Sequence, residues 1–148
     1  MGNKSNIKIQ YSTDLLDFFT DRTARSNAKF FIDRLRSGMN LLDCGCGPGS
    51  ITIDLAEIVA PGKVTGIDIE PAQIEIAKSM QSKRNVMNVR FEVGDINKLP
   101  FSGESFDAVF VHGVVEYLKD PVHVFKEIYR VLTKDGILGA RHADYGGF

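Results

Sequence analysis

The first residues with evident chemical potential form a glycine-rich turn that begins at Asp43. The stretch LLDCGCGPGS places Gly45, Gly47 and Gly49 two residues apart, directly after a short apolar run. Glycine has no Cβ, so its backbone adopts positive φ readily and lets a ligand approach closely. The sequence from Ser50 onward is typical of a helix, whose first N–H groups lack partners inside the helix. The turn therefore predicts a binding site for a nucleotide-like ligand.

The carboxylate of Asp43 narrows the class of ligand. It would repel a pyrophosphate and attract a cationic group such as an amino acid ammonium. The dinucleotide fingerprint G-x-G-x-x-G/A requires glycine or alanine at position 50, where this chain has Ser50. The turn thus fits a nicotinamide dinucleotide poorly and fits a ligand with a positively charged amino acid end better.

Two carboxylates follow later strand-like stretches. Asp68, in GIDI, stands where an acidic side chain about twenty residues past such a turn accepts hydrogen bonds from ribose. Glu70 is a second candidate for that role, or a charge at the start of the next helix. Asp95, in GDINKLPF, can accept a hydrogen from the exocyclic amine of adenine, with Ile96 and Leu99 beside the ring. The alternative for Asp95 is an Asx turn.

His112 is the candidate catalytic residue, at the end of the apolar stretch FDAVFVHG. An unperturbed imidazole titrates near neutral pH, so it could act as a general base. The alternative is a residue that only fixes the geometry of a bound ligand.

Alternating strands and helices are expected to place these residues at one edge of a sheet. We expect strands at residues 39–43, 63–69, 89–93, 106–113 and 136–142. We expect helices at residues 15–26, 27–37, 50–60 and 72–84, and another from Pro121 onward. In that last helix the apolar residues at helical spacing are Val122, Phe125, Ile128, Tyr129 and Leu132. The pattern predicts an α/β fold, a Rossmann-like, doubly wound and mostly parallel sheet with helices on both faces.

Composition argues against two classes of partner. The chain has 148 residues, of which 43% are hydrophobic, and a net charge of −1, whereas nucleic-acid binders usually carry a basic excess. No apolar run approaches the roughly 20 residues that span a bilayer, and the N-terminus lacks the apolar segment of a secretory signal. We therefore expect a cytoplasmic protein with neither nucleic-acid nor membrane partners.

The two cysteines are Cys44 and Cys46, too close in sequence for an easy disulfide. The histidines lie far along the chain without the spacing of metal ligands. We expect reduced thiols that pack in a turn, and no metal site.

In their order and spacing, these motifs resemble those of class I S-adenosylmethionine-dependent methyltransferases. DCGCGPG is similar to the first motif of that family, GIDI to the second, GDINKLPF to the third and SFDAVFVHGVVEYLKDP to the fourth. RVLTKDGIL resembles the stretch that precedes the fifth strand, with Thr133, Lys134 and Asp135 departing from the common pattern. The resemblance covers roughly residues 40 to 140. Within the class, the chain is similar to the ubiquinone/menaquinone C-methyltransferase-like group, which acts mostly on small molecules.

The resemblance implies S-adenosylmethionine as the cofactor. Its methionine end would be held by the turn, through Asp43, Gly45, Cys46, Gly47 and Gly49.

The same resemblance assigns the other half of the cofactor to later motifs. Asp68 would bind the ribose, with Ile69 against the adenine, and Asp95 and Ile96 would bind the adenine. His112 would lie beside the methionine part and face the substrate.

The resemblance also implies a division of the chain. Residues 1–39 would form N-terminal helices, with Tyr11 and Arg22 in a lid over the cofactor, and residues 40–148 would form the cofactor-binding core. The family fold carries seven strands, the last two as an antiparallel pair, and only five are evident here. We therefore expect a core truncated at its C-terminus.

The implied reaction is direct displacement of a methyl group from the cofactor onto a small-molecule acceptor. Two alternatives stay open, an NAD(P)-dependent oxidoreductase on a Rossmann sheet and a non-catalytic cofactor-binding protein. Neither the acceptor atom nor the oligomeric state follows from the sequence.

Overall fold

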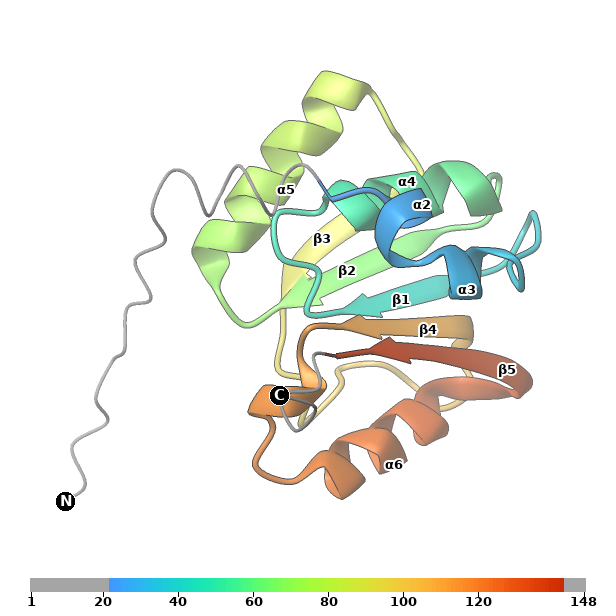
Figure 1. Ribbon diagram of the computed structural model, residues 1–148, viewed down its shortest axis with the longest axis vertical. Helices are drawn as coiled ribbons and strands as arrows, with labels where there is room; N and C mark the ends of the chain where they lie inside the picture. The colour runs from blue at the N-terminus through green and yellow to red at the C-terminus, as the bar shows by residue number, and fades with distance from the viewer. Residues whose placement is uncertain (1–21, 143–148) are drawn as a thin grey trace, which may run out of the picture.

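The computed structural model describes residues 22–142, and Figure 1 shows five strands in one sheet. The strands are β1 Leu41–Cys44, β2 Val64–Asp68, β3 Val89–Val93, β4 Phe106–His112 and β5 Leu132–Arg141. Their order is β3-β2-β1-β4-β5, and every neighbouring pair is parallel. The predicted α/β fold with a Rossmann-like parallel sheet is confirmed.

The order in which strands are added to the sheet reverses between β1 and β4. β2 and β3 extend the sheet to one side of β1, whereas β4 and β5 extend it to the other. In such sheets, the carboxyl ends of the two strands at the reversal open a crevice that binds ligands. The sequence places Asp43 and His112 near the carboxyl ends of these two strands.

Helices cover both faces of the sheet, as predicted. One face carries α4 Ser50–Val59, α5 Pro71–Arg84 and two short helices, α2 Ala24–Asn27 and α3 Lys29–Ile32. The other face carries α6 Pro121–Val131, with the short 3₁₀ helix η1 Val115–Tyr117 nearby.

Two apolar cores, one on each face, hold these layers together. Neighbouring strand residues point to opposite faces, so Leu41 packs in the core under α4 and Leu42 in the core under α6. Both leucines are fully buried, each worth about 1.5–3 kcal/mol of hydrophobic stabilisation. Because β1 is covered on both faces, all four of its residues are buried, Asp43 included. The core thus fixes the position of the carboxylate that begins the glycine turn.

The N-terminal helices differ from the prediction. The predicted helix at residues 15–26 falls mostly outside the described residues, which include only α2 at its end. The predicted helix at residues 27–37 is wrong in extent, since α3 covers only four residues. The chain must reverse before it enters β1, and it does so through turns that end at Gly38, whose φ is +91°.

The prediction of which apolar residues of α6 face the core is also partly wrong. Val122 and Tyr129 are 63% and 82% exposed, whereas Val124, Ile128 and Val131 face the core. Leu132 is not helical but begins β5, which starts four residues earlier than predicted. Among the described residues, no helix is both long and apolar enough to cross a membrane.

Candidate functional site

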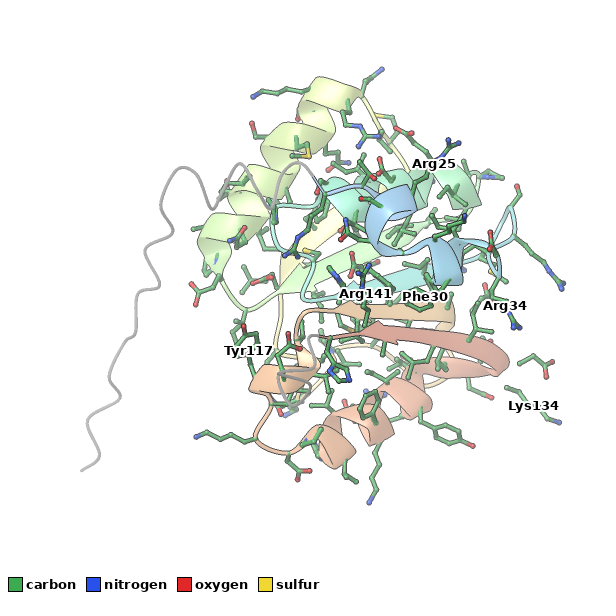
Figure 2. All side chains as sticks on the ribbon, in the orientation of Figure 1. Arg25, Phe30, Arg34, Tyr117, Lys134 and Arg141 are labelled. Atoms are coloured by element: carbon green, nitrogen blue, oxygen red, sulfur yellow. The ribbon has the colours of Figure 1, made fainter. Side chains whose placement is uncertain are left out.

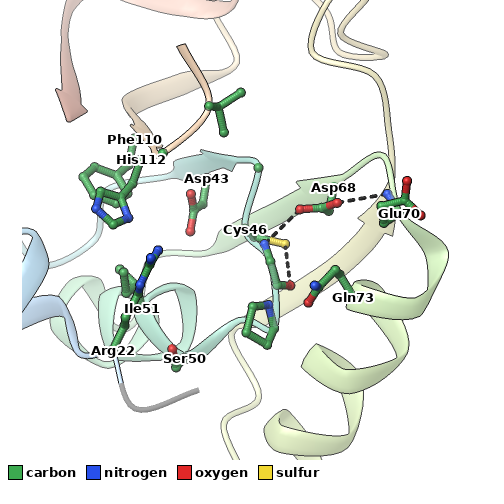
Figure 3. Close-up of a pocket in the computed structure, with 15 residues that line it drawn as sticks. Arg22, Asp43, Cys46, Ser50, Ile51, Asp68, Glu70, Gln73, Phe110 and His112 are labelled. Carbon is green, nitrogen blue, oxygen red and sulfur yellow. Dashed lines mark hydrogen bonds between the residues drawn. The ribbon is translucent and has the colours of Figure 1, made fainter. Parts of the chain in front are cut away.

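A pocket lies at the carboxyl ends of β1, β2 and β4, where the order of strands reverses (Figure 3). It brings together six of the predicted site residues, namely Asp43, Gly45, Cys46, Gly47, Asp68 and His112. It also includes Arg22, from the segment predicted to form a lid. Tyr11, the other residue predicted for the lid, lies outside the described residues.

The glycine turn packs closely against its neighbours, and two of its backbone N–H groups are already hydrogen-bonded within the protein. The N–H groups of Gly45 and Cys46 both donate to the Ile67 carbonyl, at 2.8 and 2.9 Å. Gly45 has a φ of +74°, and a Cβ on it would collide with the side chain of Val114. Gly49, with a φ of +85°, likewise leaves no room for a Cβ beside Phe91. The absence of side chains at Gly45 and Gly49 therefore lets the turn pack closely against its neighbours, while its own amides hold it to β2.

Asp43 is 3% exposed and accepts a hydrogen bond from the Thr52 hydroxyl at 2.7 Å. Burial disfavours its charged form and raises its pKa from 3.8 to about 7. The Thr52 hydrogen bond opposes this rise, and the negative charge of Asp68 adds to it. The carboxyl is therefore poised to ionise fully when a cationic group binds beside it.

Asp68 joins the turn to the end of β2. One carboxylate oxygen accepts from the Gly47 N–H at 3.0 Å, and the other accepts from the Glu70 N–H at 2.9 Å (Figure 3). A carboxylate has about four acceptor sites, so two remain for a ligand. Glu70, the rival candidate from the sequence, also lines the pocket.

His112 and Phe110 form the wall of the pocket that belongs to β4. Their rings stack with centroids 5.9 Å apart. Burial, the largest cause, and the positive charges of Arg22 and Arg141 together lower the pKa of His112 from 6.5 to about 4, against a smaller opposite effect of Glu116. The imidazole is therefore neutral at physiological pH.

Two arginines approach this wall from different elements. Figure 3 shows the Arg22 side chain reaching into the pocket near His112. Burial and the neighbouring Arg141 both lower the pKa of Arg22. Arg141, labelled in Figure 2, lies at the end of β5. It pairs in register with His112 and donates to the Asn27 carbonyl at 2.9 Å. Among the described residues that line the pocket, Arg22 is the only lysine or arginine.

Four predicted site residues do not line this pocket. Ile69 is 61% exposed, and Gly49 packs against α5 and β3 instead. Asp95 accepts from the backbone and side-chain amides of Asn97, both at 2.8 Å, as in an Asx turn. Ile96 packs against the core under α6.

Several pocket residues were missed by the sequence analysis. They are Pro48, Ile51, Gln73, Gly113 and Val114. Each lies within five residues of a motif residue, so proximity to the motifs was the signal that could have found them. The sequence could not show which of them faces the pocket.

Neither cysteine takes part in a disulfide. Burial raises the pKa of both thiols, and for Cys46 the charges of Asp43 and Asp68 add to the rise. Both thiols therefore stay protonated, and thiolate chemistry is disfavoured. Among residues 22–142, the structure contains no cluster of three metal-ligating side chains.

Comparison with known proteins gives consistent matches. A family described as a methyltransferase domain matches residues 35–145. A demethylmenaquinone methyltransferase of Lactococcus lactis is 40% identical over 101 residues, which cover 68% of this chain and 40% of that protein. The chain spans about half the length of the curated relatives that it matches.

Solved structures match the fold. A SAM-dependent methyltransferase from Aquifex aeolicus has a TM-score of 0.77 at 23% identity, over 88% of this chain and 72% of that one. Coclaurine N-methyltransferase, solved with N-methylheliamine and SAH, has a TM-score of 0.69 at 25% identity, over 87% of this chain and 35% of that one.

Proposed function

The chain belongs to the methyltransferase-domain family, in its class I S-adenosylmethionine-dependent branch, and from that premise we propose that its pocket binds S-adenosylmethionine for methyl transfer to a small-molecule acceptor. The observation that carries the proposal is the arrangement of charge in the pocket. The buried carboxyl of Asp43, the half-buried side chain of Arg22 and the carboxylate of Asp68 line one cavity around a glycine turn.

The charges fit the methionine end of the cofactor, which carries an ammonium and a carboxylate. Asp43 would ionise beside the ammonium, because a nearby positive charge favours its charged form. Arg22 would pair with the carboxylate through its planar guanidinium. These two opposite charges, on two elements of the same pocket, match a zwitterion better than they match a pyrophosphate.

The nucleoside end would lie toward β2. Asp68 has acceptor sites left after its bonds to Gly47 and Glu70, and ribose hydroxyls can donate to them. We also propose that Asp95 and Ile96 bind the adenine, because they follow β3, which ends at the same edge of the sheet as β2.

The cofactor supplies a methyl group already activated on a sulfonium, so the protein mainly has to align it with the acceptor. With a pKa of about 4, His112 is a weak general base at neutral pH. We therefore assign it the role of a neutral hydrogen-bonding residue that orients the acceptor beside the methionine part. An acceptor that is already nucleophilic would suit such a site.

The acceptor is proposed to be a small aromatic molecule of the quinol type, on the strength of the relative named demethylmenaquinone methyltransferase. The test is transfer of tritium from methyl-labelled S-adenosylmethionine to a short-chain demethylmenaquinol. Label in the extracted quinone would support the proposal. Cofactor binding without label in the quinone would refute this acceptor, and absence of cofactor binding would refute the whole assignment.

A further inference from the structure

Gln73 is a buried amide in the pocket wall whose oxygen has no hydrogen-bond partner. The side chain lies in the first turn of α5 and is 6% exposed. Its Oε1 atom accepts no hydrogen bond from any described residue. Leaving such a group unpaired in a protein interior is unfavourable, so each instance in a folded protein calls for an explanation.

Among the described residues, two other side chains have a buried oxygen of this kind, and neither is comparable. The Glu92 carboxylate lies 3.0 Å from the Arg90 guanidinium, which supplies a charged partner. Glu116 does not line the pocket. Gln73 alone of the three combines an unpartnered oxygen with a place in the wall of the cavity.

The surroundings of Gln73 indicate which part of a ligand it meets. Figure 3 shows its side chain projecting from α5 toward the glycine turn, beside Asp68 and Glu70. Asp68 is the carboxylate proposed to hold the ribose, and Gln73 follows it by five residues on the next helix. Arg22 and His112, proposed for the methionine carboxylate and the acceptor, belong to other walls of the pocket.

We propose that Gln73 is a second residue that binds the ribose of the cofactor, and that its amide pairs with one of the two ribose hydroxyls beside Asp68. The proposal rests on the proposed function, since it requires an adenosyl ligand. A hydroxyl suits the amide, because it can donate to Oε1 and also accept from Nε2. A neutral amide adds no charge near the sulfonium, so Gln73 selects by hydrogen bonding alone.

The test compares two glutamines of the same helix. Gln73→Leu removes the amide and keeps similar bulk. Gln81→Leu is the matched control, because the Gln81 amide already donates to the Val86 and Val89 carbonyls, at 3.0 and 2.7 Å, and does not line the pocket. Calorimetry would measure the affinity of each full chain for S-adenosylhomocysteine and for its 2′-deoxy and 3′-deoxy analogues. Thermal unfolding would be measured without ligand.

Opposite changes are expected in the two variants. Gln73→Leu should bind S-adenosylhomocysteine about 5- to 10-fold more weakly than the wild type. For the analogue that lacks the paired hydroxyl, the two proteins should differ less than twofold. Without ligand, Gln73→Leu should melt at the same or a higher temperature, because an unpaired buried group is gone. Gln81→Leu should melt lower and bind all three ligands like the wild type.

The outcomes separate this inference from the proposed function. If the wild type does not bind S-adenosylhomocysteine, the proposed function fails and the inference fails with it. If the wild type binds but Gln73→Leu binds equally well, the inference alone is overturned. A loss of the same size for all three ligands would also overturn it, because it would show that Gln73 only shapes the wall.

Discussion

Replacement of the buried Asp43 by asparagine should change how the stability of the protein depends on pH. The pKa of Asp43 is about 7 in the folded protein and 3.8 in the unfolded chain. Between these values the folded protein keeps a proton that the unfolded chain has released, so the contribution of Asp43 to the free energy of unfolding should fall as the pH rises from about 4 to about 7. Asparagine has nearly the same shape and does not titrate, so the variant should lack this slope.

The size of the effect follows from the shift. A shift of about 3 pKa units corresponds to about 4 kcal/mol at 1.36 kcal/mol per unit. Asp43 is almost fully buried, so solvent screening does not reduce this value greatly. The free energy of unfolding of Asp43→Asn minus that of the wild type should therefore rise by up to about 4 kcal/mol between pH 4 and pH 8.

Urea unfolding followed by circular dichroism, at intervals from pH 4 to pH 8.5, would measure this difference. Other titrating groups, His112 among them, are present in both proteins and largely cancel in the comparison. Thr52→Val is a second probe, because its hydroxyl favours the charged form of Asp43. Loss of this hydroxyl should raise the pKa of Asp43 further, so the contribution of Asp43 to the free energy of unfolding should continue to fall at higher pH. If the free energies of unfolding of the wild type and Asp43→Asn differ by an amount that is constant with pH, the account of a buried, protonated carboxyl is refuted.

Three further predictions concern the glycine turn and other residues of the pocket. Gly49→Ala should destabilise the protein by about 1–3 kcal/mol more than Gly47→Ala in urea unfolding, because both have positive φ but only Gly49 would press a methyl group against Phe91. Equal losses would contradict the steric argument. The free energy of unfolding of His112→Gln minus that of the wild type should fall between pH 4 and pH 6.5, since in that interval the unfolded chain binds a proton that folded His112 does not. A difference that is constant with pH in the same assay would show that His112 titrates normally. Arg22→Leu should weaken binding of S-adenosylhomocysteine at least about tenfold but not that of 5′-methylthioadenosine, which lacks the amino acid carboxylate, as calorimetry would show. An equal loss of affinity for both ligands would show that Arg22 does not pair with the amino acid carboxylate.

The parts of the fold that the sequence predicted well are those where one pattern dominates. The continuous apolar runs of β1 and β4 predicted strands buried on both faces. Pro71 marked the first turn of α5 correctly. In α6 the apolar residues exceeded what one face can hold, so tertiary packing decided that Val122 and Tyr129 face outward.

The pocket was predictable where backbone and strand ends define it, and not where side-chain direction does. Asp43, Asp68 and His112 each stand near the end of a strand, and parallel strands end at the same edge. Gln73 lies on a helix whose orientation depends on packing, so its place in the wall could not be read from spacing. The near-neutral pKa of Asp43 likewise depends on burial that only the folded structure reveals.

The most direct test of the central claim is calorimetric titration of this chain with S-adenosylhomocysteine and with NADH, repeated on Asp68→Asn. The account predicts saturable binding of S-adenosylhomocysteine, no binding of NADH, and a loss of affinity of about tenfold or more in the variant. Circular dichroism of Asp68→Asn would confirm that the glycine turn and sheet remain folded. Saturable binding of NADH, or no binding of S-adenosylhomocysteine by the folded wild type, would contradict the account.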